Sequence, residues 1–231
     1  MVSDATEKRL LAAAPAGWFA RQPAGFRRRL LERSVEMSFS DGDWLYGTED
    51  EAGGLFAIFD GGVHLFAAVA DKGTVLIDLA GPGRWFGQVG LLPQTHRLVT
   101  AVAAGPVRAL AVPRGVLTRF VTEFPDAWLS FTALNLEQMQ DMVRIVADIL
   151  ALPPAIRVAA RLHGLVSRTS GAYERHVPVT QAQLGEMTGL ERKTVHRALQ
   201  SLQTRGLIRL RYGAIEVLDP RGLGRAAGGS D

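Results

Sequence analysis

Side chains between residues 129 and 150 recur at alternating intervals of three and four residues, and this spacing constrains the fold more than any other feature. The positions are Leu129, Thr132, Leu136, Met139, Val143, Val146 and Leu150. Such spacing aligns the side chains along one face of an α-helix, as in a coiled coil. Because Pro153 and Pro154 follow directly, we expect the long helix to end before them.

A second apolar stripe lies on another face of the same predicted helix, which implies a second packing partner. Its positions are Phe131, Leu134, Met142, Ile145 and Ile149. One interpretation is a helix buried on all sides within a single core. The unbroken seven-residue repeat instead favours a homodimer, in which the helix packs against its copy in a second subunit. The residues predicted at this dimer interface are Leu129, Leu136, Met139, Val143, Val146 and Leu150.

The residues before the long helix predict a β domain preceded by helices. Residues 1–33 have a helical pattern, whereas from Val35 to Pro113 short apolar stretches alternate with glycine-rich turns. Regularly spaced short strands are typical of an antiparallel β-roll, jelly roll or barrel. We expect Leu55–Phe59 and Val63–Ala68 to form a hairpin through Asp60-Gly61-Gly62.

The residues after the two prolines predict a compact winged helix-turn-helix. A capping-box pattern at Thr180 and Gln183 begins one helix, and Gly206 is suited to end the next. The expected elements are a helix over Ala155–Ser167, a strand at Val177–Val179, helices over Thr180–Gly189 and Glu191–Thr204, and strands over Leu207–Arg211 and Ala214–Leu218. This order is that of a winged helix-turn-helix. The chain is therefore predicted to be α+β, with a β-roll domain at 1–124, a dimerisation helix at 125–152 and a winged domain at 153–231.

Charge divides along the same boundary. Residues 1–153 contain 14 basic and 17 acidic side chains, whereas residues 154–231 contain 12 basic and 6 acidic ones. A basic module attached to an acidic body is the electrostatic pattern of a nucleic-acid-binding protein. The alternative is a set of solvated arginine-rich faces, because the chain has only three lysines.

The predicted helix at Glu191–Thr204 presents a cationic face opposite its apolar stripe. This face comprises Arg192, Lys193, His196, Arg197 and Gln200. Basic side chains in the N-terminal half of a recognition helix reach base edges in the major groove, and an arginine there reads guanine through two hydrogen bonds. The alternative is an ordinary exposed helix, which the capping box and the two following strands argue against.

Five stretches of the chain occur in the order of one known family: Asp41–Tyr46, Gly61–Val63, Gly81–Gly87, Thr180–Leu199 and Arg205–Ile208. They resemble the Crp/Fnr family of transcription regulators. The last two resemble its DNA-binding domain and the others its cyclic nucleotide-binding-like domain, so the resemblance covers about residues 35–220. It implies that the DNA-binding residues are Thr180, Gln181, Arg192, Lys193, Thr194, His196 and Arg197. The family commonly has Glu where this chain has Lys193, so an acceptor for cytosine is replaced by a cation.

The resemblance also places an effector pocket in the β domain, and the residues there depart from those of cyclic nucleotide binders. The matching residues are Gly87, Gln88, Arg97, Leu98, Met142 and Val143. A neutral Gln88 stands at the position of a ribose-binding Glu, and Leu98 offers no hydroxyl. Arg97 either pairs with a phosphate or is a solvated residue at a strand edge. These departures predict that cAMP is not a tight ligand and leave another small-molecule effector open.

Other chemistry has weak support in the sequence. The chain has no cysteine, which excludes disulfides and Cys-ligated metals. It shows no spacing typical of zinc ligands, no P-loop and no nucleophile elbow, so we expect neither an enzyme nor a metal site. Some members of the resembled family hold haem through a histidine of the β domain; His64 or His96 could serve, although an ordinary structural role is favoured. The N-terminus does not resemble a signal peptide and no stretch suits a membrane helix, so a cytoplasmic location is expected.

Together these features predict a homodimeric, sequence-specific DNA-binding regulator, which would contact RNA polymerase if it activates transcription. Two alternatives remain open. One is a small-molecule-binding module that gates a partner protein, and the other is a DNA-binding regulator whose β domain takes no ligand.

Overall fold

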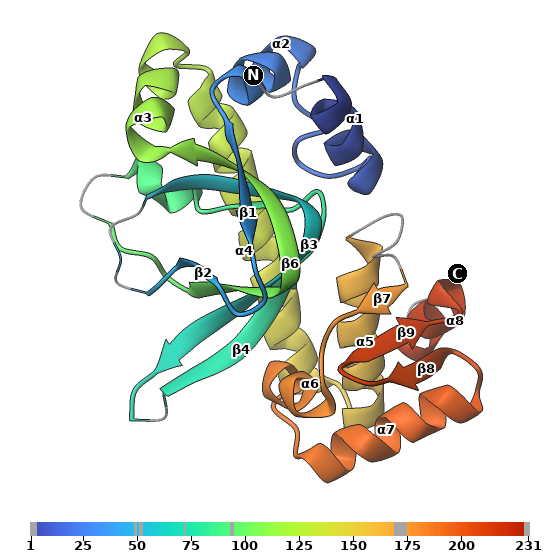
Figure 1. Ribbon diagram of the computed structural model, residues 1–231. Coiled ribbons are helices and arrows are strands. Elements are labelled where there is room, and N and C mark those ends of the chain that lie inside the picture. Colours follow the sequence, from blue (N-terminus) through green and yellow to red (C-terminus); the bar gives the residue numbers. More distant parts are fainter. Residues whose placement is uncertain are drawn as a thin grey trace. The chain divides into compact units, whose positions relative to one another are not determined.

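The computed structural model describes residues 4–48, 50, 53–71, 73–92, 95–168 and 175–228 (Figure 1). The chain forms two compact units. The N-terminal unit comprises Met1–Thr74 and Asp78–Met139, and the C-terminal unit comprises Val75–Ile77 and Gln140–Asp231. Within the described ranges, no helix is long and apolar enough to cross a membrane.

The N-terminal unit is built on a six-stranded sheet with antiparallel pairing. β6 pairs with β1, β2 and β3, and β3 pairs with β5; the path through the sheet is β1-β6-β3-β4. Its helices and strands are α1 (Asp4–Ala13), α2 (Ala24–Glu32), β1 (Val35–Phe39), β2 (Trp44–Tyr46), β3 (Gly54–Val69), β5 (Trp85–Phe86), the 3-10 helix η1 (Gln88–Leu91), β6 (Thr100–Pro113), α3 (Arg114–Glu123) and both ends of β4 (Gly73–Ala80), whose middle residues Val75–Ile77 belong to the C-terminal unit. This architecture confirms the predicted antiparallel β domain.

The predicted hairpin at residues 55–68 is wrong, because both halves belong to the single strand β3. β3 pairs with β6 along its length, from Gly54 opposite Pro113 to Phe66 opposite Thr100. The glycines lie where the register shifts, between Ile58 and Gly62. Gly61 has a φ of 84°, and a Cβ there would lie 2.3 Å from the carbonyl oxygen of Pro106. The glycines therefore permit a β-bulge rather than a turn.

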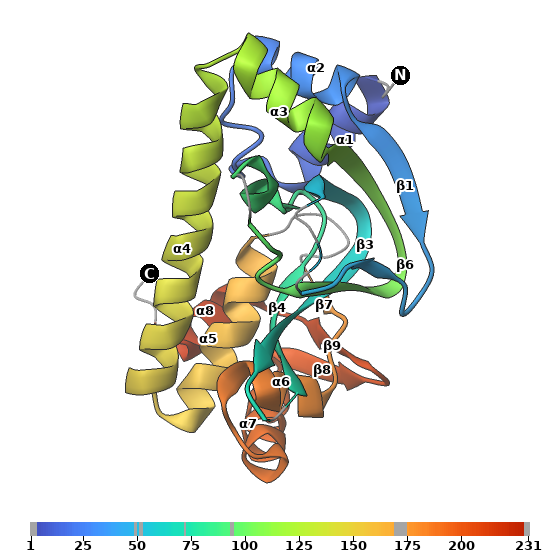
Figure 2. The same cartoon turned by 90° about the vertical axis from the view of Figure 1, so that its left-hand side faces the viewer.

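An aromatic cluster holds the helices of the N-terminal unit against its sheet. Figure 2 shows α1, α2 and α3 gathered at one end of the β domain. Trp18 lies between Phe131 and Trp85, at ring-centroid distances of 5.9 and 5.5 Å, and its indole nitrogen donates to the carbonyl oxygen of Ser130 over 2.6 Å. Because aromatic side chains bury large apolar areas, this cluster fixes the first turns of the long helix to the β domain.

The long helix α4 spans Ala127–Ala151 and has two different apolar faces. Phe131 and Leu134 of the second stripe are buried, at 1% and 2% exposure. The seam side chains are exposed, from 48% at Leu136 to 80% at Leu150. The interpretation of a helix buried on all sides in one core is therefore wrong. The seam is thus available for a partner, and its role as a dimer interface stays a prediction.

The C-terminal unit has the winged helix-turn-helix order expected from the sequence. β9 pairs with β7 and β8 in a three-stranded sheet. The helices and strands of this unit are α5 (Pro154–Ser167), β7 (His176–Val177), α6 (Gln181–Thr188), α7 (Arg192–Thr204), β8 (Ile208–Arg211), β9 (Ala214–Val217) and α8 (Pro220–Ala226). The predicted capping box is confirmed: Oγ1 of Thr180 accepts from the Gln183 amide over 3.2 Å, and Oε1 of Gln183 accepts from the Thr180 amide over 2.8 Å.

Candidate nucleic-acid interface and effector pocket

Helix α7 exposes a row of cations because its other face is anchored in the core. Val195, Ala198, Leu199 and Leu202 are buried, which turns Lys193, His196 and Arg197, one or two residues away, toward solvent. Arg192, Lys193, His196 and Arg197 are exposed, and Thr194 is half-buried. Within the part of the chain that the structure describes, the three side chains Arg192, Lys193 and Arg197 have no ion-pair or hydrogen-bond partner, so their donors face water.

A side-chain hydrogen bond joins α6 and α7 at two residues that were predicted to bind DNA. Nδ1 of His196 on α7 lies 3.3 Å from Oε1 of Gln181 at the first turn of α6. The Thr180 hydroxyl accepts the cap hydrogen bond through its oxygen and so retains its own proton for an external acceptor. A helix N-terminus of this kind favours an anion such as a phosphate.

A groove of about 470 Å³ runs beside these residues and includes the wing, which the sequence prediction did not assign to the site. It is lined by Val179, Thr180, Gln181, Ala182, Arg192 and the wing residues Leu210–Ile215. Tyr212 at the wing turn is fully exposed. The signal available in the sequence was the dipeptide Tyr212-Gly213 between the two strands, where an exposed aromatic residue has no packing role.

The cations of the wing differ from those of α7 because a carboxylate compensates them. Nε of Arg211 and Nη1 of Arg209 lie 3.1 and 3.3 Å from Oε2 of Glu216. The hydrogen bond from Arg211, aided by the charge of Arg209, holds the pKa of the Glu216 carboxyl below its ordinary value. The strongest unpaired positive charge of this surface therefore lies on α7 rather than on the wing.

In the β domain, Arg97 is turned into the protein. It is 3% exposed, so the interpretation of a solvated strand-edge residue is wrong. Nη1 donates to the carbonyl oxygen of Gly87 and Nη2 to that of Gly54, both over 3.1 Å. The guanidinium carbon lies 4.0 Å from the ring centroid of Tyr46, a cation–π contact. Burial lowers the pKa of Arg97 from its ordinary value and raises the pKa of Tyr46 to about 12.

Gly87 is required by this arrangement on two grounds. Its φ is 95°, a left-handed value that other residues adopt at a cost. A Cβ at Gly87 would also lie 2.6 Å from Nη1 of Arg97 and 2.6 Å from the Gly54 carbonyl oxygen. The glycine therefore allows the guanidinium to close over the backbone at the start of η1.

Gln88, the neighbour of Gly87, is 2% exposed and bonds to α4. Its Nε2 donates to Oδ1 of Asn135 and to Oε1 of Gln138, both over 2.8 Å. Gln138 in turn donates through Nε2 to the carbonyl oxygen of Trp85 over 2.9 Å. Sequence reasoning did not single out Asn135 or Gln138, although Asn135 lies between the two apolar stripes and Gln138 interrupts the second one between Leu134 and Met142.

The remaining predicted pocket residues differ in their burial. Leu98 is 74% exposed, and Val143 belongs to the exposed seam of α4. Met142 is half-buried and, with Val143, lies in the C-terminal unit. Arg97 donates to two carbonyl oxygens and Gln88 to α4, while Nε of Arg97 and Oε1 of Gln88 are buried with no hydrogen-bond partner among the described residues. That cAMP is not a tight ligand therefore stays a prediction.

The histidines considered for haem have ordinary surroundings. His64 is half-buried on β3 with its ring centroid 6.0 Å from that of Phe66, and His96 is exposed. No three His, Asp or Glu side chains among the described residues are grouped so as to hold a metal ion.

Comparison with known protein families gives two matches to this chain. Residues 36–124 match the cyclic nucleotide-binding domain, and residues 156–226 match the Crp-like helix-turn-helix domain. Between them the matches cover the β domain and the winged domain but not α4.

Relatives of known function match over most of their length. The chain is 30% identical over 198 residues to the transcriptional regulator SdrP of Thermus thermophilus, covering 81% of this chain and 91% of that protein. It is 24% identical over 202 residues to a CRP-like cAMP-activated global transcriptional regulator of Mycobacterium tuberculosis, covering 86% and 90%.

Solved structures share the fold. FixK2 from Bradyrhizobium japonicum superposes with a TM-score of 0.72 at 19% identity, over 86% of this chain and 99% of that one. A CRP/FNR-family regulator from Thermus thermophilus gives a TM-score of 0.64 at 24% identity, over 85% and 100%. At these identities the likeness extends to the fold alone.

Proposed function

Because this chain belongs to the Crp/Fnr family of transcription regulators, we propose that it binds DNA as a homodimer with one α7 helix in the major groove of each half-site. The observation that carries the proposal is the cationic face of α7. Arg192, Lys193 and Arg197 are exposed and have no partner among the described residues, whereas the cations of the wing pair with Glu216. A surface of this kind gains most from an external polyanion.

The homodimer part of the proposal rests on the exposed seam of α4. Leaving apolar side chains in water along a 25-residue helix is unfavourable, and a second copy would cover them. A two-fold dimer of winged domains would read two half-sites about 34 Å apart, in a pseudo-palindromic sequence.

Within each half-site, the proposed roles follow from side-chain chemistry. Arg197 and Arg192 would read guanine through paired hydrogen bonds, while Lys193 would contact a guanine or thymine acceptor or a phosphate. Thr180 and Gln181, at the N-terminus of α6, would hold the DNA backbone.

Gel shifts over a range of salt concentrations test the proposal directly. DNA binding should weaken as salt rises, with a slope of about 0.9 for each phosphate contact. Replacing Arg192, Lys193 and Arg197 together with Ala should abolish binding, while Arg28→Ala, an exposed arginine of the N-terminal unit, should leave it unchanged. Equal binding by both variants would show that α7 does not carry the interaction.

A second candidate function is a regulator that needs no cyclic nucleotide, and the state of Arg97 favours it. The Mycobacterium tuberculosis relative is named as cAMP-activated. In this chain the guanidinium already bonds the carbonyl oxygens of Gly54 and Gly87. A phosphate would compete with these internal hydrogen bonds for the buried guanidinium, so we expect cAMP neither to bind tightly nor to raise DNA affinity.

Calorimetry with cAMP tests the second candidate. A micromolar dissociation constant with a matching rise in DNA affinity would establish cyclic-nucleotide control and contradict the second candidate. Absence of heat, with DNA binding unchanged by cAMP, is the expected result. In vitro transcription with purified RNA polymerase, on a template that carries the site, then distinguishes activation from repression.

A small-molecule-binding module that gates a partner protein is the less favoured alternative. Such a module has no need for the exposed cationic helix and capped turn of the C-terminal unit. Failure to bind DNA at any salt concentration, in the presence of a ligand that binds the β domain, would favour that alternative.

A further inference from the structure

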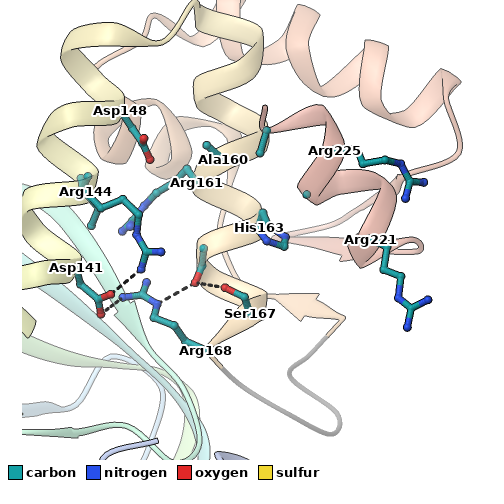
Figure 3. Close-up of a pocket in the computed structure, with 14 residues that line it drawn as sticks. Asp141, Arg144, Asp148, Ala160, Arg161, His163, Ser167, Arg168, Arg221 and Arg225 are labelled. Atoms are coloured by element: carbon teal, nitrogen blue, oxygen red, sulfur yellow. Dashed lines mark hydrogen bonds and ion pairs between the residues drawn. The ribbon is translucent and has the colours of Figure 1, made fainter. Parts of the chain in front are cut away.

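The C-terminal unit contains a pocket that is separate from the cationic face of α7. It has a volume of about 430 Å³ and lies between the last turns of α4, the helix α5 and the helix α8 (Figure 3). Pockets that hold small organic ligands start at about 300 Å³, so this one exceeds the needs of a lone inorganic ion.

The lining of the pocket is basic. Five arginines and two aspartates contribute to it, but Figure 3 shows Arg221 and Arg225 pointing away from Asp141, and Nη2 of Arg225 lies 4.0 Å from Oδ2 of Asp219. The three remaining arginines exceed the two aspartates by one positive charge. The charged residues of the lining are Arg144, Arg161, Arg168, Arg221, Arg225, Asp141 and Asp148. Like charges gathered around a cavity raise its affinity for a ligand of opposite charge.

Asp141 sets the positions of two of these arginines. Oδ1 accepts from Nη2 of Arg144 over 2.9 Å, and Oδ2 accepts from Nη1 of Arg168 over 3.0 Å. Nε of Arg168 also donates to the carbonyl oxygen of Gly164 over 2.9 Å. Figure 3 shows both guanidinium groups meeting at Asp141 between α4 and α5. A pair of guanidinium groups held in this way is pre-organised for a planar or tetrahedral oxyanion.

The wall of the pocket between α5 and α8 adds a buried polar atom and apolar surface. Nδ1 of His163 is buried and has no hydrogen-bond partner among the described residues. A Cβ on Gly224 of α8 would lie 3.1 Å from Cε1 of His163, so the glycine allows the two helices to approach. Ile145, Ala160 and Ala227 supply apolar contacts.

The pocket lies on the side of α4 that faces away from the seam. Asp141 and Asp148 are five residues beyond the seam positions Leu136 and Val143, which places them about half a turn from the seam direction. A ligand there would not compete with the proposed dimer contact.

We propose that this pocket binds a small organic phosphate, with its phosphate at Arg144 and Arg168 and its organic part toward His163 and α8. Because the pocket joins the dimerisation helix to α5 of the DNA-binding domain, occupancy would change DNA affinity. That last step rests on the proposed function, whereas the binding site does not.

Calorimetry without DNA tests the site, with pyrophosphate as the probe at constant ionic strength. We expect saturable binding with a dissociation constant of about 1 mM or tighter. The double variant Arg144→Gln/Arg168→Gln should weaken it on the order of 10- to 100-fold, the loss that follows removal of a charge-assisted contact. Arg192→Gln, which removes the same charge from α7, should leave it unchanged.

Three results would overturn the site: no saturable heat, equal affinity in the double variant, or loss of binding in Arg192→Gln. If Arg168→Gln impairs folding, Arg144→Gln alone serves, because the Arg144 side chain is 65% exposed. DNA affinity measured by fluorescence anisotropy then tests the coupling. Pyrophosphate should shift the affinity of the wild type more than that of the double variant; an equal shift in both would overturn the regulatory role.

Discussion

Arg97 of the β domain and the arginines of α7 were both predicted to contact ligands, but the protein uses them in opposite ways. Arg97 is buried and donates to two carbonyl oxygens of its own chain, with its guanidinium against Tyr46. Arg192 and Arg197 are exposed and have no partner among the described residues. Arg97 directs two of its donors to its own chain, although its Nε is buried with no partner among the described residues. The arginines of α7 keep all their donors for a partner.

The difference shows that residue type at a matching position does not determine whether a group binds a ligand. A buried guanidinium that already bonds to backbone carbonyls stabilises the fold, and a ligand gains only by displacing those contacts. An exposed cation contributes little to stability and gains by neutralising a polyanion. Stability should therefore depend on Arg97, and DNA affinity on the arginines of α7. Four measurements test this contrast and extend it to the α4 seam and to Tyr46.

The largest effect is expected at the α4 seam, whose side chains are exposed like the arginines of α7. The double variant Met139→Asp/Val143→Asp would place four charges in each dimer interface, at several kcal/mol per buried charge. Sedimentation should then show a monomer. Gln140→Asp/Ala147→Asp, which adds equal charge beside the seam, serves as the control. A wild-type dimer in the seam variant would show that the seam is not the interface.

Arg97→Met should produce the next largest effect, on stability. The change removes two donors from buried carbonyl oxygens, and we expect the free energy of unfolding to fall by about 3 kcal/mol. Urea denaturation measures this quantity. Arg197→Met, the matched exposed arginine, should change it by less than about 0.5 kcal/mol. Equal stability losses in the two variants would remove the contrast between the regions.

Arg197→Ala should affect DNA recognition and leave stability unchanged. Losing a paired arginine contact to guanine should cost about 1–3 kcal/mol of binding free energy and relax the preference at one base pair. Lys193→Glu should shift the neighbouring preference toward cytosine, because a carboxylate accepts from its amino group. Selection from random DNA compares the three proteins. Identical preferences in all of them would indicate that α7 contacts only the backbone.

The smallest expected effect concerns Tyr46, whose pKa is raised to about 12 by burial. Because the folded state favours the protonated phenol, its contribution to stability is complete below about pH 10 and is lost as the pH rises toward 12. At pH 11 the loss should be about 1 kcal/mol. Comparing the phenolate absorbance of the wild type and Tyr46→Phe isolates this group. A difference that titrates near pH 10 would mean that Tyr46 is accessible to water.

Periodicity in the sequence was enough to predict the main elements of the fold. The three-four spacing from Leu129 to Leu150 predicted α4, and the capping pattern at Thr180 and Gln183 predicted α6. Both signals are local, since helix spacing and caps depend on residues within a few positions of each other. The cationic face of α7 was predictable for the same reason, because its buried stripe fixes which residues face outward.

The tertiary structure alone determined the roles of Gly61 in β3 and of Arg97. Gly61 looked like a turn residue, but the bulge depends on the approach of the Pro106 carbonyl from β6. Arg97 was compatible with a phosphate site or a solvated edge, and its actual partners, Gly54 and Gly87, are 43 and 10 residues away. Contacts between distant segments leave no periodic signal in the sequence, because they depend on how the strands pack rather than on local spacing.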